Sequence, residues 1–225
     1  MRQHVSTKLD DVIGHLFKEY PNGLTPDPRT IKSYLAQFAF RSEGKWKISP
    51  EALISATLHS ETIASILAIG RKMGAQRFVG RREQPERTER GAVLRDLADL
   101  TSLSVVKKSL PGGVRAIERL EMVDVVFLAK GRPELLCLWE VENSTNFTSA
   151  IQRGSNAPRD VPKFMVIPED REQELLAISD PSFPEQFAIN GWRYLTYPEV
   201  KRLASHASVS LRAALKTAKG LSHGG

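Results

Sequence analysis

Three carboxylates stand at the ends of two short apolar runs, and their type and spacing could bind a divalent cation. Asp124 precedes the apolar run 125–128, and Glu140 and Glu142 follow the apolar run 135–139. A turn containing Gly and Pro separates the two runs, as is typical of paired buried strands. A charge at a buried strand end is costly unless it is matched or binds a metal. Because hard cations take carboxylate oxygens, the pattern favours a site for Mg²⁺, with Mn²⁺ as a substitute.

The segment after these carboxylates adds two polar candidates. Residues 143–145, an Asn-Ser-Thr sequence, form a turn and helix-start signal, and a helix is predicted at 146–157. A helix that leaves the end of a carboxylate-bearing strand could return Gln152 and Arg153 over the same site, where they would contact a phosphate. Structural ion pairs produce similar clusters, so a purely structural role is the alternative.

The order of these residues resembles the PD-(D/E)xK nuclease superfamily, which has the restriction-endonuclease-like fold. In that family an acid on one strand is followed on the next strand by (D/E)-x-K, and the following helix often carries a Gln or an Arg. Asp124 matches the first acid and Glu140 the second, while Glu142 stands at the lysine position and gives Glu-x-Glu. Some restriction enzymes of the superfamily also carry Glu-x-Glu. The resemblance therefore implies a metal-dependent DNA endonuclease and leaves its general base open.

The same resemblance implies the residues of a metal site. Asp124, Glu140 and the carbonyl of Val141 would hold Mg²⁺. Glu61, on a helix predicted at 59–74, would add a ligand or hold a water molecule near the ion. Small residues beside Glu61 would let this helix pack close to the sheet and bring Glu61 near Asp124.

The remaining site residues have roles in binding and proton transfer. The resemblance implies that Glu142 positions the attacking water or serves as the base. Arg153, together with Gln152, would bind the scissile phosphate or stabilise its developing charge. His59 shares the apolar face of the 59–74 helix with Ile63. Both a satisfied core histidine and a catalyst are compatible with that position.

Apolar patterning predicts a mixed α/β fold for residues 57–225, with a restriction-endonuclease-like sheet flanked by helices on both faces. Strands are predicted at 76–82, 120–128, 134–142, 161–167 and 192–196. Helices are predicted at 59–74, 146–157, 169–178 and 197–216.

Residues 1–56 are predicted to form a separate, mostly helical region that resembles a winged helix. Helices are predicted at 6–19 and 29–38, a hairpin strand at 44–48, and a further helix start at 49–51. In a winged helix the second helix can enter the major groove while the wing touches the backbone. The residues expected to contact DNA here are Arg29, Lys32, Ser33, Lys45 and Lys47. A protein partner is the alternative.

The charge balance favours a polyanionic partner. There are 32 Lys and Arg against 26 Asp and Glu, which gives a net charge of +6. Neutralising phosphates releases counterions and supplies most non-specific affinity for nucleic acid. Arg77 and Arg81, which flank the strand residues 78–80, are therefore further DNA-binding candidates. The charged stretch that follows, 84–90, is equally typical of a solvated loop.

Several function classes are disfavoured. Cys137 is the only cysteine, which excludes an internal disulfide and a cysteine zinc cluster, and its apolar neighbours predict a core position. The five His residues show no zinc or hydrolase-triad spacing. The longest apolar runs are about five residues, short of the ~20 that span a bilayer. The amino terminus lacks the apolar core of a signal peptide, so a cytoplasmic protein is expected.

These patterns together predict a magnesium-dependent endodeoxyribonuclease of a restriction, defence or DNA-processing type. Cutting both strands of double-stranded DNA usually needs two copies of one site, so a homodimer is expected. The alternative is a catalytically inactive DNA-binding or protein-interaction subunit that keeps the nuclease fold. Glu142 in place of lysine supports this alternative, whereas Asp124, Glu140 and Glu61 argue against it.

Overall fold

The computed structural model contains two compact units, Met1–Ala56 and Thr57–Gly225. It describes residues 6–19, 27–110, 113–143, 147–178, 180 and 182–221. Ser144 and Thr145 of the turn predicted after Glu142 lie outside these residues.

The first unit has two helices and a small antiparallel sheet. Its elements are β1 (Ser6–Thr7), α1 (Leu9–Glu19), α2 (Pro28–Phe38), β2 (Ala39–Ser42) and β3 (Lys45–Ile48), and the strand order is β1-β3-β2. The side chain of Asp27 accepts a hydrogen bond from the Arg29 N–H and so caps α2. Glu43 and Gly44 have φ angles of 52° and 76° and form the two-residue turn of the β2–β3 hairpin.

The first predicted helix begins later than expected. Ser6 and Thr7 pair with Lys47 and Trp46 of β3, so they extend the sheet and α1 starts at Leu9. The helix predicted at 29–38 and the strand predicted at 44–48 match α2 and β3 within a residue. The expected arrangement of helix, helix and hairpin is present in this unit.

α3 (Pro50–Lys72) is a single helix of 23 residues, whereas the sequence predicted a start at 49–51 and a separate helix at 59–74. The Ser49 hydroxyl accepts a hydrogen bond from the Ala52 N–H at its start. Among the described helices, α3 alone is long and apolar enough to cross a membrane, with a mean hydropathy of 1.4 over 18 residues. The core helix of a globular protein passes the same test, and Ile63 and Ile66 are fully buried in the core of the second unit.

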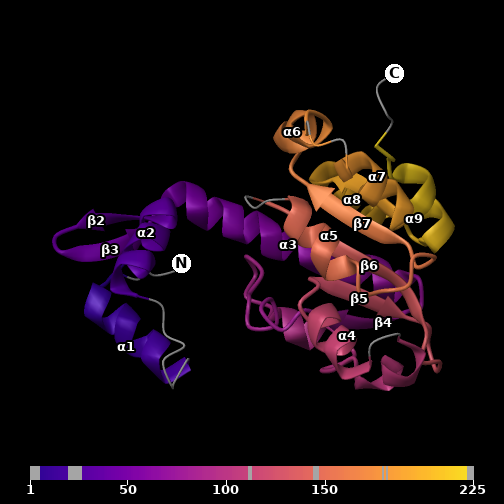
Figure 1. Cartoon of the computed structure of the whole chain (residues 1–225), viewed down its shortest axis with the longest axis horizontal. Coiled ribbons are helices and arrows are strands. Elements are labelled where there is room, and N and C mark those ends of the chain that lie inside the picture. The colour runs from indigo at the N-terminus through magenta and orange to yellow at the C-terminus, as the bar shows by residue number, and fades with distance from the viewer. Residues whose placement is uncertain are drawn as a thin grey trace. The chain divides into compact units, whose positions relative to one another are not determined.

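The second unit is built on a five-stranded mixed sheet (Figure 1). Its strands are β4 (Gln76–Val79), β5 (Val125–Leu128), β6 (Leu135–Val141), β7 (Lys163–Ile167) and β8 (Trp192–Thr196), in the order β4-β5-β6-β7-β8. β5 is antiparallel to both of its neighbours, β4 and β6, whereas β6, β7 and β8 run parallel to one another. The amino-terminal end of β5 therefore lies at the same edge as the carboxyl ends of β6, β7 and β8.

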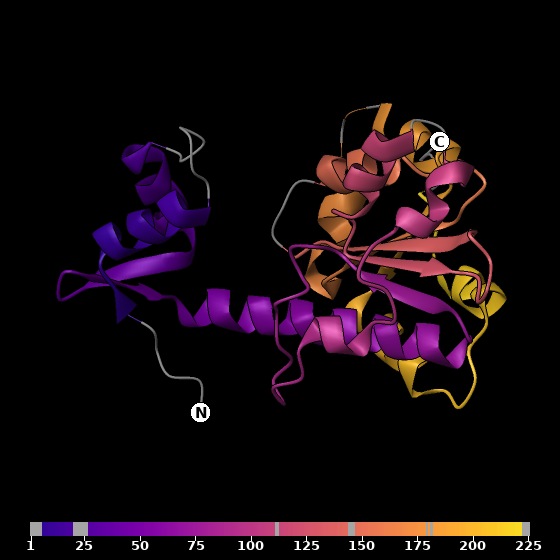
Figure 2. The same ribbon diagram turned by 90° about the horizontal axis from the view of Figure 1, so that it is seen from below.

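Helices cover both faces of this sheet (Figure 2). One face packs against α3, α8 (Tyr197–Ser205) and α9 (Leu211–Thr217) in a core that includes Val125, Phe127, Trp139 and Phe164. The other face packs against α4 (Gly113–Leu120), α5 (Phe147–Gly154) and α7 (Ser182–Ile189) in two apolar clusters. The short elements are η1 (Leu94–Leu97), η2 (Ser104–Ser109), η3 (Glu169–Arg171) and α6 (Glu172–Leu176). The predicted mixed α/β fold is confirmed.

Two close contacts stabilise this unit, one within the sheet and one between the sheet and a helix. Trp139 of β6 stacks on Phe164 of β7, with ring centroids 4.2 Å apart. Gly154, at the end of α5, lies so near the Trp192 ring that a Cβ at this position would clash with it. Glycine therefore allows α5 to approach the sheet at β8.

Several predicted elements were wrong in extent, and three of them have a clear structural reason. The strand predicted at 120–128 begins only at Val125, because Leu120 ends α4 and the next four residues form a turn. The helix predicted at 197–216 is two helices, α8 and α9, since Ser210 caps a new helix by accepting a hydrogen bond from the Ala213 N–H. The helix predicted at 169–178 is a 3₁₀ turn followed by the short α6. Neither α4 nor α7 was predicted.

Candidate active site

The sheet brings the three predicted carboxylates to one edge and one face. In the antiparallel register Val125 pairs with Trp139, so Asp124 lies across from Glu140. Side chains alternate along a strand, which puts Glu140 and Glu142 on the face covered by α4 and α5. All three side chains are buried, with residue exposures of 4%, 0% and 1% for Asp124, Glu140 and Glu142. The backbone N–H of Val141 donates to Asp124 Oδ2 over 2.6 Å.

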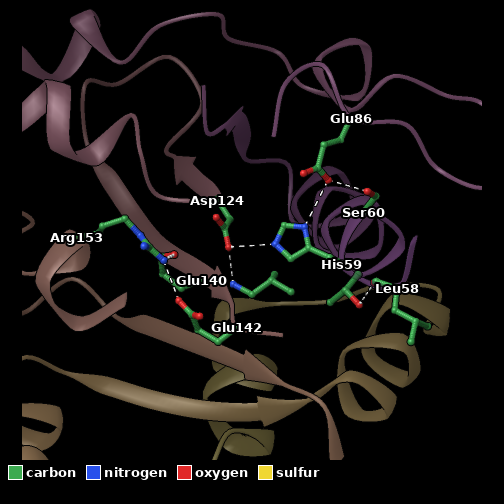
Figure 3. A network of polar contacts seen from close by, with 10 residues as sticks. Leu58, His59, Ser60, Glu86, Asp124, Glu140, Glu142 and Arg153 are labelled. Carbon is green, nitrogen blue, oxygen red and sulfur yellow. Dashed lines mark hydrogen bonds and ion pairs between the residues drawn. The ribbon is translucent and has the colours of Figure 1, made fainter. Parts of the chain in front are cut away.

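Arg153 of α5 joins this cluster from the covering helix (Figure 3). Its Nε and Nη2 donate to Oε1 and Oε2 of Glu140 at 2.8 and 2.6 Å. The same Nη2 donates to Glu142 Oε1 at 2.8 Å. The predicted return of Arg153 over the carboxylates is therefore present, and the guanidinium binds the acids directly.

Burial and charge shift the pKa values of this pair. Burial and the neighbouring Asp124 raise the pKa of Glu140 well above its usual value, and the contact with Arg153 opposes this rise. Burial alone would lower the pKa of Arg153, but its hydrogen bonds to Glu140 raise the pKa above its ordinary range. Buried carboxylates that repel each other are thus held together by one cation.

His59 of α3 contacts the site from the other side (Figure 3). Its Nε2 lies 3.8 Å from Asp124 Oδ2, and its Nδ1 lies 3.4 Å from Glu86 Oε2. The Ser60 hydroxyl donates to the same Glu86 oxygen at 2.6 Å. Burial lowers the pKa of His59, but Asp124 and Glu86 outweigh burial and raise the pKa to about 10. His59 is thus an imidazolium at neutral pH, which is not a base, and it lies beside Asp124 rather than in an apolar core.

Glu83 is an acid near the site that the sequence did not identify. Its residue exposure is 8%, and its Oε2 has no hydrogen-bond partner in the described structure. Burial, followed by repulsion from Asp124, raises the pKa of Glu83 to about 7. The side chain lies against Gly80, where a Cβ would clash with both Glu83 Oε2 and the Val123 carbonyl oxygen. Burial depends on this tertiary contact, so the charged sequence around Glu83 carried no signal for it.

Glu61 does not join the carboxylates at Asp124. Its Oε1 accepts a hydrogen bond of 2.6 Å from the Glu89 N–H. Glu61 also lines a pocket of about 530 Å³ that includes Tyr197 and Lys201. Two residues of helix turn the side-chain direction by roughly 200°. Because His59 points at Asp124, Glu61 two residues later points elsewhere.

Gln152 also lies apart from the carboxylates. It is exposed and lines a pocket of about 380 Å³ next to Arg153. The lining residues of this pocket are Arg82, Arg119, Met122, Ser149, Gln152 and Arg153.

The basic candidates differ in their surroundings. Arg29, Lys32 and Ser33 are exposed on α2, Lys45 is exposed on β3, and Lys47 is half-buried on the same strand. In the second unit, Arg77 binds both carboxylate oxygens of Asp99 at 2.6 and 2.8 Å with a side-chain exposure of 13%. Arg81 forms an ion pair with Glu121 and stays 60% exposed. The contacts of Arg77 are those of a structural ion pair. Cys137 is fully buried, as predicted.

The oxygen donors around Asp124 fit a hard cation. Among the described residues, no three His, Cys, Asp or Glu side chains are placed so that together they could hold a metal ion. Mg²⁺ does not need three, because it commonly takes one or two carboxylates and keeps several waters. Asp124 Oδ1 accepts no hydrogen bond from the described residues, and the peptide of Val141 lies beside the same carboxylate. Asp124, Glu140 and the Val141 carbonyl are the residues that could hold the ion.

A mixed sheet flanked by helices, with buried carboxylates at one sheet edge, is the arrangement of a restriction-endonuclease-like α/β domain. A family model described as the type II restriction enzyme NmeDI C-terminal domain matches residues 47–218, which is more than half of the chain. The chain belongs to this family. A restriction-enzyme family indicates a nuclease role and a DNA substrate. Searches of curated proteins and of solved structures gave no match.

Proposed function

We propose that this protein is a metal-dependent DNA endonuclease of the PD-(D/E)xK type, in its Glu-x-Glu variant, which hydrolyses phosphodiester bonds for restriction or defence. One observation carries the proposal: Asp124, Glu140 and Glu142 are buried at one sheet edge, with Arg153 bound to two of them. Three buried acids at a strand end are costly for stability, which is typical of a site kept for its chemistry.

The metal in this proposal is Mg²⁺, with Mn²⁺ as a substitute. Asp124, Glu140 and the Val141 carbonyl would hold it, and when bound it would polarise the phosphoryl oxygen and the attacking water. Glu140 would release one oxygen from Arg153 to serve as a ligand. Burial and Asp124 raise the pKa of Glu140, and a bound cation would lower it again by favouring the carboxylate form.

The remaining residues bind and orient the substrate. Arg153, released in part from Glu140, would contact the scissile phosphate and stabilise its developing charge. Glu142 would then accept a proton from the attacking water or hold that water in line. His59 holds Asp124 through an ion pair and does not act as a base, because it is protonated at neutral pH.

The first unit would bind double-stranded DNA as a winged-helix-like module. Its strand order β1-β3-β2 and the two helices before the hairpin support this proposal. The contacts proposed are with Arg29, Lys32 and Ser33 on α2 and with Lys45 and Lys47 on β3. Arg81 of the second unit would add a contact to the DNA backbone. We further propose a cytoplasmic homodimer, since two sites would cut two strands.

A second function is favoured by one specific observation. Arg153 binds both oxygens of Glu140, and Glu142 takes the family's lysine position, so the acids and the arginine form a closed ion-pair cluster. A DNA-binding or interaction subunit that keeps the fold without cleavage would have such a cluster. Measured cleavage decides between the two functions.

The test is cleavage of supercoiled plasmid by the purified protein with Mg²⁺ or Mn²⁺. Asp124→Asn keeps the size of the side chain and can still accept the Val141 hydrogen bond, but it removes the charge. The matched control is Glu134→Gln, an exposed acid at the opposite end of the sheet. We expect nicking by the parent and by the control, and none by Asp124→Asn or with EDTA. DNA binding without metal-dependent cleavage by the parent would favour the inactive subunit.

A further inference from the structure

The described residues that line the pocket beside Arg153 have basic or neutral side chains. Arg82 follows β4, Arg119 lies on α4, and Ser149 and Gln152 lie on α5, with Met122 as an apolar wall. Its volume of about 380 Å³ is larger than a water site needs and is of the size that binds small ligands. No carboxylate lines it among the residues that the structure describes.

The two outer arginines of this pocket make no ion pair within the described part of the chain. Arg82 and Arg119 are both exposed. By contrast, Arg77 and Arg81 are paired with Asp99 and Glu121. A pair of guanidinium groups that face one pocket repel each other unless an anion lies between them. The pocket therefore has the charge and donors of an anion site, because guanidinium groups bind phosphate in a bidentate manner.

Arg153 connects this pocket to the candidate active site. It lines the pocket and also binds Glu140 and Glu142. The three acids lie on the sheet face that α4 and α5 cover, and Arg119 and Gln152 come from these same helices. Because the single side chain of Arg153 reaches both the acids and the pocket, a DNA strand with one phosphate at the acids would bring a neighbouring phosphate near the pocket.

We propose that this pocket is a subsite for the backbone of the cleaved DNA strand, in which Arg82 and Arg119 bind a phosphodiester next to the scissile one. Gln152 and Ser149 donate hydrogen bonds to the same phosphate, and Met122 contacts the sugar. The subsite deepens the proposed nuclease function and rests on it. It positions the strand by its backbone, so it contributes to affinity for all sequences.

The experiment measures binding of a mixed-sequence DNA duplex in EDTA across a range of salt concentrations. The test variant is Arg82→Gln/Arg119→Gln. The matched control is Arg132→Gln/Arg159→Gln, which removes two exposed arginines at the opposite end of the sheet. Arg82→Lys/Arg119→Lys keeps the charge, and thermal unfolding shows whether each variant is folded.

We expect the test variant to bind more weakly and to lose roughly 1 unit from the slope of log K against log salt, since each neutralised phosphate contributes about 0.9. The control and the lysine variant should keep the parental slope. An unchanged slope in the test variant, or an equal loss in the control, would overturn the subsite. A deoxynucleoside monophosphate that binds the pocket tightly without competition from the duplex would also overturn it.

The same variants separate this proposal from the nuclease function. If the parent binds DNA without cleaving it and the test variant still loses slope, the subsite stands and the nuclease proposal fails. If the parent cleaves plasmid and the test variant keeps both its slope and its cleavage rate, the subsite fails and the nuclease proposal stands. If both stand, the test variant should have a raised KM with a smaller change in kcat.

Discussion

Arg153 binds both carboxylate oxygens of Glu140, with Nε 2.8 Å from Oε1 and Nη2 2.6 Å from Oε2. Glu140 is fully buried, whereas the Arg153 side chain is 25% exposed. The pair therefore joins a residue of the sheet interior to a residue that reaches the adjoining pocket. In the proposed reaction this guanidinium would also bind the substrate phosphate. Loss of Arg153 should therefore lower stability, through the lost contact with Glu140, and lower catalysis, through the lost contact with the phosphate.

The first prediction concerns the stability of this pair. Arg153→Met leaves Glu140 buried beside Asp124 without its cation, and removal of one partner of a buried pair costs about 3–5 kcal/mol. Arg153→Met/Glu140→Gln removes both charges and should recover much of that loss. Urea unfolding of the parent, both single variants and the double variant measures the coupling. Additive effects would contradict a direct energetic link.

The second prediction concerns the lysine of the family pattern. Glu142 is 1% exposed and accepts a hydrogen bond from Arg153 Nη2, so Glu142→Lys would place two cations in contact. We expect this variant to be less stable by about 2–4 kcal/mol and no more active on plasmid. Glu142→Lys/Arg153→Met leaves a single cation at the site, so it should recover the stability that Glu142→Lys loses. A stable and more active Glu142→Lys variant would mean that the contact between Glu142 and Arg153 supports neither the fold nor cleavage.

The third prediction concerns a buried lysine far from the acids. Lys163, at the start of β7, is fully buried and donates to the carbonyl oxygens of Pro158, Val161 and Asn190 at 2.8 to 2.9 Å. Lys163→Met leaves three carbonyl groups without this donor, so we expect a loss of about 2–4 kcal/mol. Exposed Lys216→Met is the control for loss of a lysine charge.

This lysine lies at the opposite end of the sheet from the carboxylates, so its role should be structural. Urea unfolding should show the loss in Lys163→Met and not in Lys216→Met. The salt dependence of DNA binding should be the same for both variants and the parent. A specific loss of DNA affinity in folded Lys163→Met would contradict a purely structural role.

The sheet was predictable because each strand is a short apolar run bounded by turn residues. The strand at 192–196 was predicted at its observed bounds, and the other four were each predicted one to five residues too long at one or both ends. The alternation in Leu120-Glu-Met-Val-Asp124 has the period of a strand, yet Leu120 completes the apolar face of α4 with Ala116 and Ile117. The local pattern fits both a strand and the end of a helix. The packing of α4 on the sheet decides in favour of the helix, and the sequence pattern alone does not show that packing.

The chemistry at the site was predictable where it depends on strand register, and it was not where it depends on loops. Asp124, Glu140 and Glu142 could be placed together because alternation and pairing fix their direction. Glu83 and Glu86 reach the site through the segment after β4, which contains no regular helix or strand. Glu83 packs against Gly80 and Glu86 contacts His59, and neither contact has a sequence pattern.

The fourth prediction concerns Glu83, whose pKa is raised from 4.5 to about 7 by burial and by Asp124. The folded protein binds this proton more tightly than the unfolded chain, so stability falls as pH rises from about 4.5 to about 7. Glu83→Gln removes this loss. We expect the variant to be more stable than the parent at pH 8, by about 1–3 kcal/mol, and little different at pH 4.5. Urea unfolding at both pH values measures the difference in the free energy of unfolding between the parent and the variant. Glu118→Gln, at an exposed position, is the control.

The fifth prediction concerns His59, whose pKa rises from 6.5 to about 10 because Asp124 and Glu86 outweigh burial. A raised pKa in the folded state contributes stability that is fully present below pH 6.5 and is lost as pH rises through about 10. His59→Gln should therefore be less stable than the parent at pH 6, by about 2 kcal/mol, and the difference should shrink by pH 10. Exposed His206→Gln is the control. A difference that stays constant from pH 6 to pH 10 would mean that His59 packs as a neutral ring and does not hold Asp124 by charge.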